Sequence, residues 1–482
     1  QNLMVLQTIF GASQNDMTTI IGTTRADFIN VESSSQYVES LDGYDTIGGE
    51  SAIDNIIVDS GTEDDVITFQ AEVLNSKLIL GSGKDWANIK DYSGSIYGGA
   101  GNDSVTVAIG RTLTNTLVRG DGGDDNFNLV NASDSTINSN SDDDIISISG
   151  HTINTQVYGG RQQDTIIITN ASDSLIRGDA NEDKITIKGD LSGTIVNGNA
   201  NDDQLIIESS SVKNSTVYGG GGNDDINISS DAILIFGNKG NDDINLTSSA
   251  NHSIFGGAGN DSIDSNSTKP LFLQGEMGSD QITVTAGAVN EAVHTIDGGS
   301  GNDILTGSSG DEYIDGGTED NGKDTITSTG GNDTIYSRAG DDLINLEAGV
   351  NAGNVRVQAG NGNDVIEVTL DELSYADIIR GEGGSDTLAV VGSPADFSMW
   401  EGNTIAERAF NSISSIEILA FGTPNSRYNI SGTKTIELSG KVQTAGILNI
   451  DASNATGAGD DVLEVNALLF TSKADLTFTG SN

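Results

Sequence analysis

One short motif recurs along most of this chain and limits its fold more than any other feature. Four copies differ in only a few letters: residues 98–105 read GGAGNDSV, 219–226 read GGGGNDDI, 256–263 read GGAGNDSI and 298–305 read GGSGNDIL. Their common form is G-G-x-G-x-D-x-U, in which U is a large aliphatic residue, and weaker copies fill the intervals between them. Self-similarity at a fixed period is the signature of a repeat architecture.

The aspartate at the sixth motif position sets the period, which is about 20 residues over the first thirteen copies. In order, these aspartates are Asp45, Asp65, Asp85, Asp103, Asp125, Asp143, Asp164, Asp183, Asp203, Asp224, Asp242, Asp261 and Asp280. The later members are Asp303, Asp324, Asp333, Asp342, Asp364 and Asp386. Two of the later intervals shorten to nine residues, one on either side of Asp333.

One period can be interpreted as two short strands joined by a polar turn. Asp164 is followed by the β-branched run TIIIT, the turn NASDS, the apolar LIR and then the next glycine loop at Gly178. No strand is expected to exceed about five residues, and no stretch shows a sustained helical period. A single coil cannot bury its aliphatic side, whereas stacked coils can. We therefore expect an all-β fold: a right-handed parallel β-roll or β-solenoid with about 20 residues per coil.

Alternation along each strand predicts which side chains point inward. After the glycine loop these are Val105, Val107, Ile166, Ile168, Ile185, Ile187, Ile226 and Ile228. Before the loop they are Ile96, Val157, Ile176, Val196, Val217, Ile235 and Ile254. The predicted core is a thin, continuous ladder.

Composition excludes several classes of protein. The formal net charge is -49 over 482 residues, which disfavours nucleic acid as a partner. Cysteine is absent, so neither disulfides nor thiolate metal sites contribute. No run of 18 apolar residues exists, so no membrane span is expected.

Stacking places the motif aspartates in a column about one rung apart, where like charges repel. A hard divalent cation between successive loops reverses the sign of that interaction. Calcium accepts six to eight oxygen ligands in irregular geometry, whereas magnesium requires a stricter octahedron. Glycines leave the loop carbonyls free to turn toward an ion. The column therefore predicts many bound Ca²⁺ ions.

The nonapeptides resemble the calcium-binding repeats of the RTX (hemolysin-type) proteins, which form a parallel β-roll. The resemblance covers roughly residues 41–388. It implies that the sixth-position aspartates supply side-chain ligands. It also implies carbonyl ligands from the loop glycines, including Gly98, Gly120, Gly159, Gly219, Gly237, Gly256 and Gly298.

One departure from that family concerns the second loop of each coil. The usual coil has two glycine loops, whereas most coils here pair one glycine loop with a Ser/Asn/Asp turn such as NASDS at 131–135. Calcium is therefore expected along one edge. The stretch from Asp324 to Asp342 is the exception, and there two-edged binding is expected.

Four regions follow from these patterns. Residues 1–40 hold degenerate N-terminal coils, 41–290 the main calcium β-roll, and 291–390 tighter and mixed RTX-type coils. Residues 391–482 are β-rich and are similar to segments of bacterial surface-layer proteins. Neither end shows a capping unit, which favours a piece of a longer chain or ends that neighbouring subunits cover.

No catalytic constellation is found, so the chain is not expected to be an enzyme. The three histidines lie outside any H-E-x-x-H motif, and neither G-x-S-x-G nor a phosphate-binding loop occurs. His151 and His252 fall in the variable turns and are expected to be solvated.

The residue before each first glycine forms an outward column. Its members are Tyr97, Arg119, Asn138, Tyr158, Arg177, Asn197, Tyr218, Phe236 and Phe255. The column is interpreted either as a self-stacking ladder or as a contact face for another subunit or a cell-surface polysaccharide. The expected function is a calcium-stabilised extracellular structural protein of the bacterial cell surface that assembles with its own copies into a surface layer, sheath or fibre. The alternative is a calcium-rigidified stalk or binding region of a secreted adhesin or exported enzyme.

Overall fold

The computed structural model describes residues 17–209, 211–230, 233–248, 250–288, 293–317, 321–347, 353–369, 376–391, 404–405, 412–422, 428–429, 433–437, 447, 449–453, 455–456, 462–466 and 477–480. Residues 1–16 of the predicted degenerate N-terminal region and residues 392–403 of the predicted C-terminal region lie outside the described residues. Contacts divide the chain into two compact units, Gln1–Asp242 and Asp243–Asn482. The expected all-β parallel solenoid with about 20 residues per coil is confirmed in each unit.

Each coil of the N-terminal unit contains a strand before the glycine loop and a strand after it. The pre-loop strands are β1 (Thr18–Ile21), β3 (Gln36–Glu39), β6 (Ile57–Asp59), β8 (Val73–Ser82), β10 (Tyr92–Ala100), β12 (Thr112–Gly122), β15 (Thr136–Ser141), β17 (Gln156–Arg161), β19 (Leu175–Ala180), β22 (Ile195–Ala200), β25 (Thr216–Gly221) and β27 (Leu234–Lys239). The post-loop strands are β2 (Phe28–Asn30), β4 (Thr46–Gly49), β7 (Val66–Phe69), β9 (Trp86–Ile89), β11 (Ser104–Val107), β13 (Asn126–Leu129), β16 (Ile145–Ile153), β18 (Thr165–Ser172), β20 (Lys184–Ile187), β23 (Gln204–Ile207) and β26 (Asp225–Ile228). Short strands in the polar turns are β5 (Ile53–Asp54), β14 (Asn131–Ser133), β21 (Leu191–Ser192) and β24 (Val212–Lys213).

The C-terminal unit repeats this arrangement. Its post-loop strands are β28 (Asp243–Leu246), β30 (Ser262–Ser265), β32 (Gln281–Val284), β34 (Ile304–Thr306), β36 (Thr325–Ser328), β38 (Leu343–Leu346), β40 (Val365–Thr369), β42 (Thr387–Val391), β45 (Ile418–Phe421), β48 (Asn449–Ala452) and β51 (Thr477–Gly480). Its pre-loop strands are β29 (Ser253–Ala258), β31 (Phe272–Met277), β33 (Val293–Ser300), β35 (Asp311–Asp315), β37 (Thr334–Tyr336), β39 (Arg356–Asn361), β41 (Ile378–Gly383) and β44 (Ile413–Ser414). Two smaller parallel sheets are formed by β43 (Thr404–Ile405), β47 (Thr433–Glu437) and β50 (Val462–Asn466), and by β46 (Tyr428–Asn429) and β49 (Ala455–Thr456).

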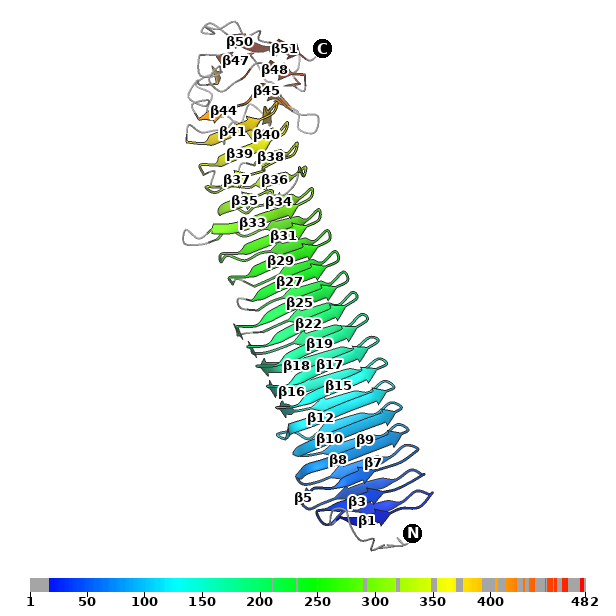
Figure 1. Cartoon of the computed structure of the whole chain (residues 1–482). Coiled ribbons are helices and arrows are strands. Elements are labelled where there is room, and N and C mark those ends of the chain that lie inside the picture. The colour runs from blue at the N-terminus through cyan, green and yellow to red at the C-terminus, as the bar shows by residue number, and fades with distance from the viewer. Residues whose placement is uncertain are drawn as a thin grey trace. The chain divides into compact units, whose positions relative to one another are not determined.

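Like strands of successive coils pair in parallel, as Figure 1 shows for the ribbon of each unit. Within the N-terminal unit, for example, Ile176 of β19 pairs with Val157 of β17 on one side and with Val196 of β22 on the other. Several pre-loop strands are longer than the five residues expected. The strand β12 has 11 residues, because pairing continues through the first glycines of the loop and back into the preceding turn.

The core follows the predicted alternation. All fifteen side chains expected to point inward are buried, from Ile96 in β10 to Ile254 in β29. Because every coil adds a similar pair of aliphatic layers, each unit has a narrow core that continues along its stack. No helix long and apolar enough to cross a membrane occurs in the described parts of the chain.

The glycine loop needs its special residues for two different reasons. The second and fourth positions are left-handed, as at Gly99 (φ 113°) and Gly101 (φ 121°), and in weaker copies Asn199 (φ 88°) and Asn201 (φ 77°) take these positions. The first position has no such backbone requirement. In most coils it is glycine because a side chain there would meet the motif aspartate and the next coil.

Candidate functional site

The sixth-position aspartates line the edge of each unit where the glycine loops lie. We call this edge the loop edge and the row of aspartates the acidic column. In the N-terminal unit its members are Asp45, Asp65, Asp85, Asp103, Asp125, Asp144, Asp164, Asp183, Asp203, Asp224 and Asp242. In the C-terminal unit they are Asp261, Asp280, Asp303, Asp324, Asp342, Asp364 and Asp386. All of these side chains are buried.

Each carboxylate in the acidic column uses one oxygen to connect two coils. The Oδ1 atom of Asp203 accepts the backbone N–H of Asp183 at 2.8 Å, and Asp224 Oδ1 accepts the N–H of Asp203 at 2.9 Å. The same bond recurs at 2.7–3.0 Å in the C-terminal unit, from Asp261 to Asp386. The aspartate is thus a structural acceptor even without an ion.

The second oxygen of these carboxylates has a different environment. The Oδ2 atom is buried and has no hydrogen-bond donor at Asp45, Asp65, Asp85, Asp103, Asp125, Asp144, Asp164, Asp183, Asp203, Asp224, Asp280, Asp342, Asp364 and Asp386. A buried anionic oxygen without a donor is costly, so its recurrence in successive coils indicates a missing positive ligand.

The first glycine of each motif shows what faces this second oxygen. A β-carbon added to Gly159 would lie 2.6 Å from Asp164 Oδ2 and 2.6 Å from the carbonyl oxygen of Gly178 in the next coil. At Gly275 the corresponding distances, to Asp280 Oδ2 and to the Gly298 carbonyl oxygen, are 2.2 and 2.4 Å. The carboxylate and the next coil's carbonyl therefore converge on one gap, which only glycine leaves open.

These groups fit a hard cation and, in particular, calcium. Two oxygens that face each other repel, whereas a cation between them is attracted by both. Among the described residues no group of three or more His, Asp or Glu side chains could hold a metal ion. An ion at this edge must therefore take many of its ligands from backbone carbonyls, which calcium accepts readily. The aspartates with their free Oδ2 and the carbonyls of glycines such as Gly178, Gly219 and Gly298 would hold it.

Burial also changes how readily these carboxyls ionise. It raises the pKa of Asp103, Asp164 and Asp203 to about 8 and that of Asp125, Asp183 and Asp280 to about 7. The amide N–H of the preceding coil lowers each pKa in part, and carboxylates nearby raise it again. Without a bound cation the column therefore holds protons near neutral pH.

The sequence pattern predicted Asp143 as a member of this column, but the structure places it one residue away from the buried position. Asp143 is exposed, and its Oδ1 accepts the backbone N–H of Gln163 at 3.0 Å. Asp144 takes the buried position, where its Oδ1 accepts the N–H of Asp125 at 2.7 Å. The run of three aspartates concealed the register, although counting back two residues from the buried Ile146 would have identified Asp144.

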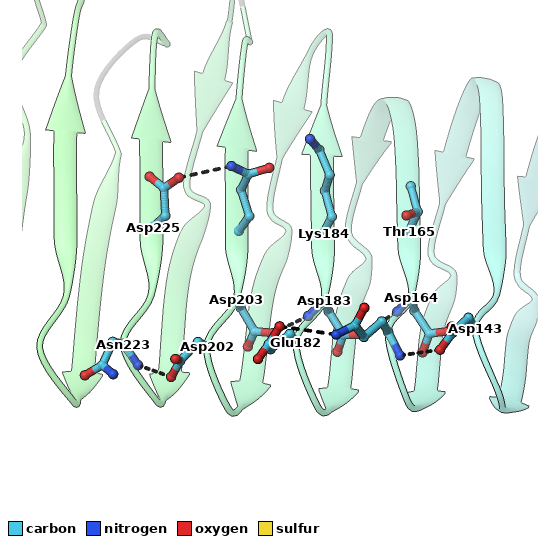
Figure 2. A pocket seen from close by; sticks show the side chains of 12 residues that line it. Asp143, Asp164, Thr165, Glu182, Asp183, Lys184, Asp202, Asp203, Asn223 and Asp225 are labelled. Atoms are coloured by element: carbon cyan, nitrogen blue, oxygen red, sulfur yellow. Dashed lines mark hydrogen bonds between the residues drawn. The ribbon is translucent and has the colours of Figure 1, made fainter.

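Asp143 belongs to a second, exposed row at the fifth motif position. Figure 2 shows this row beside the acidic column, with Glu182, Asp202 and Asn223 in successive coils. Asp202 Oδ1 accepts the backbone N–H of Asn223 at 2.7 Å, so the fifth-position row connects coils in the direction opposite to the acidic column. The Asn-Asp pair of the motif therefore supplies two structural ladders, a role that the sequence pattern did not reveal for the asparagine.

The opposite edge, which we call the turn edge, has an uncharged ladder in the N-terminal unit. The Thr155 N–H donates to Ser174 Oγ at 3.1 Å, and the Thr194 N–H donates to Ser215 Oγ at 3.2 Å. Each hydroxyl also donates to a carbonyl two residues earlier, as Ser174 does to Ser172 at 2.7 Å. Because hydroxyls are both donors and acceptors, this ladder is satisfied without an ion.

Acidic residues replace the hydroxyls at the turn edge within residues 307–333. The backbone N–H of Glu312 donates to Asp333 Oδ1 at 2.8 Å, and both side chains are buried. Burial raises the pKa of both carboxyls. Asp333 thus lies on the turn edge, while Asp324 and Asp342 lie in the acidic column, where the Asp324 N–H donates to Asp342 Oδ1 at 2.8 Å. Each of the two nine-residue intervals around Asp333 therefore spans half a coil, between the loop edge and the turn edge.

The histidine prediction was wrong for His252. His151 is exposed, as expected, but His252 is buried at the turn edge, with its Nε2 3.1 Å from Ser248 Oγ. A polar turn that joins stacked coils has neighbours above and below, so its side chains can be buried even though the turn reads as a surface loop.

Six segments match the family model of the RTX calcium-binding nonapeptide repeat (four copies): residues 95–111, 211–230, 295–321, 320–351, 350–369 and 373–389. The chain carries RTX calcium-binding repeats. No curated protein matches the chain. The RTX matches include Asp103, Asp224 and Asp364, while Asp164 and Asp183 lie between matched segments and have the same buried geometry.

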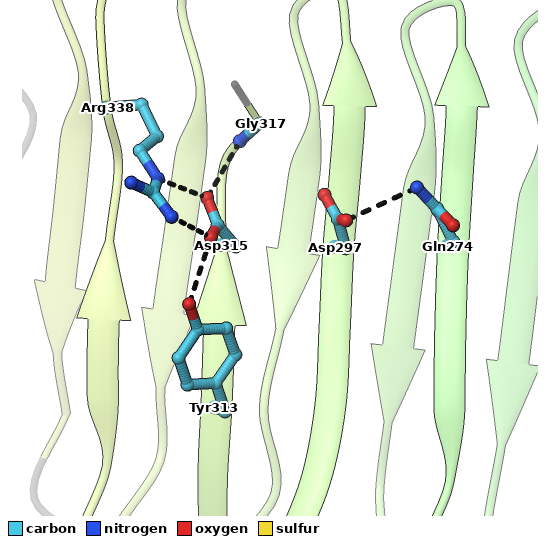
Figure 3. A network of polar contacts seen from close by, with 6 residues as sticks. All are labelled: Gln274, Asp297, Tyr313, Asp315, Gly317 and Arg338. Carbon is cyan, nitrogen blue, oxygen red and sulfur yellow. Dashed lines mark hydrogen bonds and ion pairs between the residues drawn. The ribbon is translucent and has the colours of Figure 1, made fainter. Parts of the chain in front are cut away.

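The outward column next to the RTX loops forms a stacked ladder. Tyr218 and Phe236 pack face to face, with ring centroids 5.2 Å apart and planes 10° apart. In the C-terminal unit the same column becomes polar, as Figure 3 shows: Gln274 Nε2 donates to Asp297 Oδ2 at 3.3 Å, and Arg338 pairs with Asp315. These contacts support the self-stacking interpretation of the column.

Removing one aspartate of the RTX column should have a local, measurable cost. Asp224→Ala removes the acceptor of the Asp203 N–H, so we expect the free energy of unfolding to fall by about 1–3 kcal/mol. Urea denaturation measures the change, and hydrogen exchange should show faster exchange in the two adjacent coils. The matched control is Asp225→Ala, whose half-buried side chain accepts hydrogen bonds from Gln204 and Asn227 and should change stability by about 0.5 kcal/mol or less. Equal effects of the two substitutions would contradict the structural role of Asp224.

Proposed function

We propose that this protein is a calcium-stabilised extracellular structural protein that assembles with copies of itself into a surface layer, sheath or fibre of a bacterial cell. The observation that carries the proposal is the acidic column: buried carboxylates, many of which, such as Asp164 and Asp280, have an oxygen without a donor that faces a backbone carbonyl of the next coil. Such a column is unstable without cations and is made rigid by them, because each ion connects two coils. The role is structural, and it requires no catalytic group.

Export fits this requirement for calcium. Sensor proteins inside cells bind calcium at much lower concentrations than extracellular modules do, and extracellular modules are tuned to about 0.1–1 mM. Sites built from a motif carboxylate and neutral backbone carbonyls have few charged ligands and suit the higher range. The absence of cysteine from the chain is compatible with an exported protein but does not require it.

Assembly is supported by charge and by surface regularity. The net charge of -49 keeps calcium-free chains apart, whereas each bound Ca²⁺ adds two positive charges and weakens that repulsion. Large apolar side chains also point outward from regular positions, among them Trp86, Ile145 and Ile195, each more than 40% exposed. Exposed apolar side chains on a rigid scaffold are suited to contacts between identical chains.

Calcium should therefore switch self-association. We expect light scattering to rise across a calcium titration, after the circular dichroism change that reports folding, and electron microscopy to show an ordered lattice or filament. A folded monomer at intermediate calcium serves as the control for scattering. If fully loaded protein stays monomeric at high concentration, assembly is excluded, and a stalk or binding region of an adhesin or exported enzyme becomes the better proposal.

A further inference from the structure

The first motif position is serine, not glycine, in four coils of the described chain. These residues are Ser40, Ser60, Ser139 and Ser337, and all four are fully buried. Each occupies the place at which the glycine coils leave a gap between a carboxylate and the next coil's carbonyl. The substitution therefore changes the one feature of the coil that suits an ion.

The serine hydroxyls make the same contact in all four coils. Ser139 Oγ donates to the Gly159 carbonyl oxygen at 2.6 Å, and Ser60 Oγ donates to the Leu80 carbonyl oxygen at 2.6 Å. Ser40 and Ser337 donate to the equivalent carbonyls of Ser60 and Ala359 at 2.5 and 2.7 Å. In each case the acceptor is the first-position carbonyl of the next coil, the group that faces the gap in glycine coils.

Each hydroxyl also lies beside the carboxyl of its own coil. The Ser139 hydroxyl lies close enough to Asp144 to lower the pKa of its carboxyl against the effect of burial, and Ser40, Ser60 and Ser337 act in the same way on Asp45, Asp65 and Asp342. The Oδ2 atoms of these four aspartates still have no hydrogen-bond donor, as in the glycine coils, because each serine hydroxyl donates its proton to the carbonyl instead. The serine side chain thus occupies the gap between the two oxygens, and its hydroxyl satisfies the carbonyl alone.

We propose that the first-position serines are built-in substitutes for calcium: a hydroxyl replaces the ion in the gap, and these coils bind no calcium there. The acidic column is then divided into separate ion-binding runs. In the N-terminal unit, Ser139 separates the glycine coils of Gly98 and Gly120 from those that begin at Gly159. The inference rests on the proposed calcium function and adds which coils are excluded from it.

The steric argument agrees with the hydrogen bonds. The β-carbon of a first-position residue points directly at the gap, within 2.6 Å of both oxygens at Gly159. A serine there fills the space that the ion needs, and it supplies one donor to the carbonyl that would have been an ion ligand. Calcium would have to displace a buried hydrogen bond to bind in such a coil.

Counting bound ions in the full chain by native mass spectrometry tests the inference. Ser139→Gly opens the gap between Asp144 and the Gly159 carbonyl, so we expect one more bound calcium than in the parent chain. Gly159→Ser closes a gap, and we expect one ion fewer. Ser139→Ala is the matched control, because its β-carbon still fills the gap while the hydroxyl is lost, and its ion count should equal that of the parent.

The outcomes distinguish a failure of the serine inference from a failure of the proposed function. If the parent binds several calcium ions but Ser139→Gly and Gly159→Ser both keep the parental count, the serine inference is overturned and the calcium function stands. If the parent binds no calcium, both fail together. Circular dichroism at saturating calcium verifies that each variant is folded, and should Ser139→Gly not fold, the count for Gly159→Ser decides.

Discussion

Removing calcium at pH 8 should abolish most of the β-sheet circular dichroism signal, and millimolar calcium should restore it. At this pH the carboxylates of the acidic column ionise, and neighbouring members lie about one rung apart. Two unit charges about 5 Å apart repel by about 3 kcal/mol at an effective dielectric constant of about 20, and this term recurs at nearly every coil. In a stack where each coil is stabilised by its neighbours, such a recurrent term exceeds the marginal stability of the fold.

The control for this experiment is magnesium. Magnesium prefers an octahedron of fixed size and retains its water, so an equal concentration should restore less of the signal at the same ionic strength. Sodium chloride at matched ionic strength separates site binding from screening of the surface charge. A spectrum that does not change after exhaustive chelation would count decisively against the calcium column.

Mild acid should stabilise the calcium-free protein, which is the second large effect we expect. The pKa of Asp103, Asp164 and Asp203 is about 8 in the folded chain, against an ordinary value of 3.8. Between these values the folded state binds more protons than the unfolded state, so its stability falls as the pH rises. The stabilisation by protons is complete below about pH 4 and is lost as the pH rises through 6 to 8. Thermal unfolding of calcium-free protein should therefore begin at a clearly higher temperature at pH 5.5 than at pH 8.

Calcium-loaded protein should show the opposite trend, because bound calcium requires ionised ligands. Repeating the calcium-free measurement in about 0.5 M salt tests the alternative that acid only relieves repulsion between surface charges, which salt would screen. If the difference between pH 5.5 and pH 8 disappears at high salt, the buried column is not its source. The calcium-free sample should be prepared by extraction and desalting, since chelators bind calcium weakly at acid pH.

The coil and its core could be predicted from the chain alone because they follow from local, periodic rules. Alternation placed Ile166, Ile168 and Ile176 inside, and each is fully buried. The recurrence of glycine and aspartate indicated parallel stacking, since only identical coils can bury identical faces on one another. That Asp103 and Asp203 belong to one column also followed from the period.

Register within a run of like residues could not be predicted from side-chain type. Asp142, Asp143 and Asp144 are chemically identical, and a shift of one residue moves a side chain from the column to the surface. The edge to which Asp333 belongs was ambiguous for a related reason. A nine-residue interval fits either a shorter coil or half a coil, and only the pairing of β37 with β35 and β39 places it at the turn edge.

The sequence by itself determined the all-β class, the coil of about 20 residues, the aliphatic core and the presence of an acidic column. These features depend on side-chain type and period, which a single chain displays completely. Tertiary structure alone decided which oxygen of each aspartate is used by a neighbouring amide, which oxygen faces a carbonyl, and which hydroxyl fills the gap at Ser139. The physical reason is that each of these contacts joins residues about 20 positions apart, so it exists only after coils have stacked.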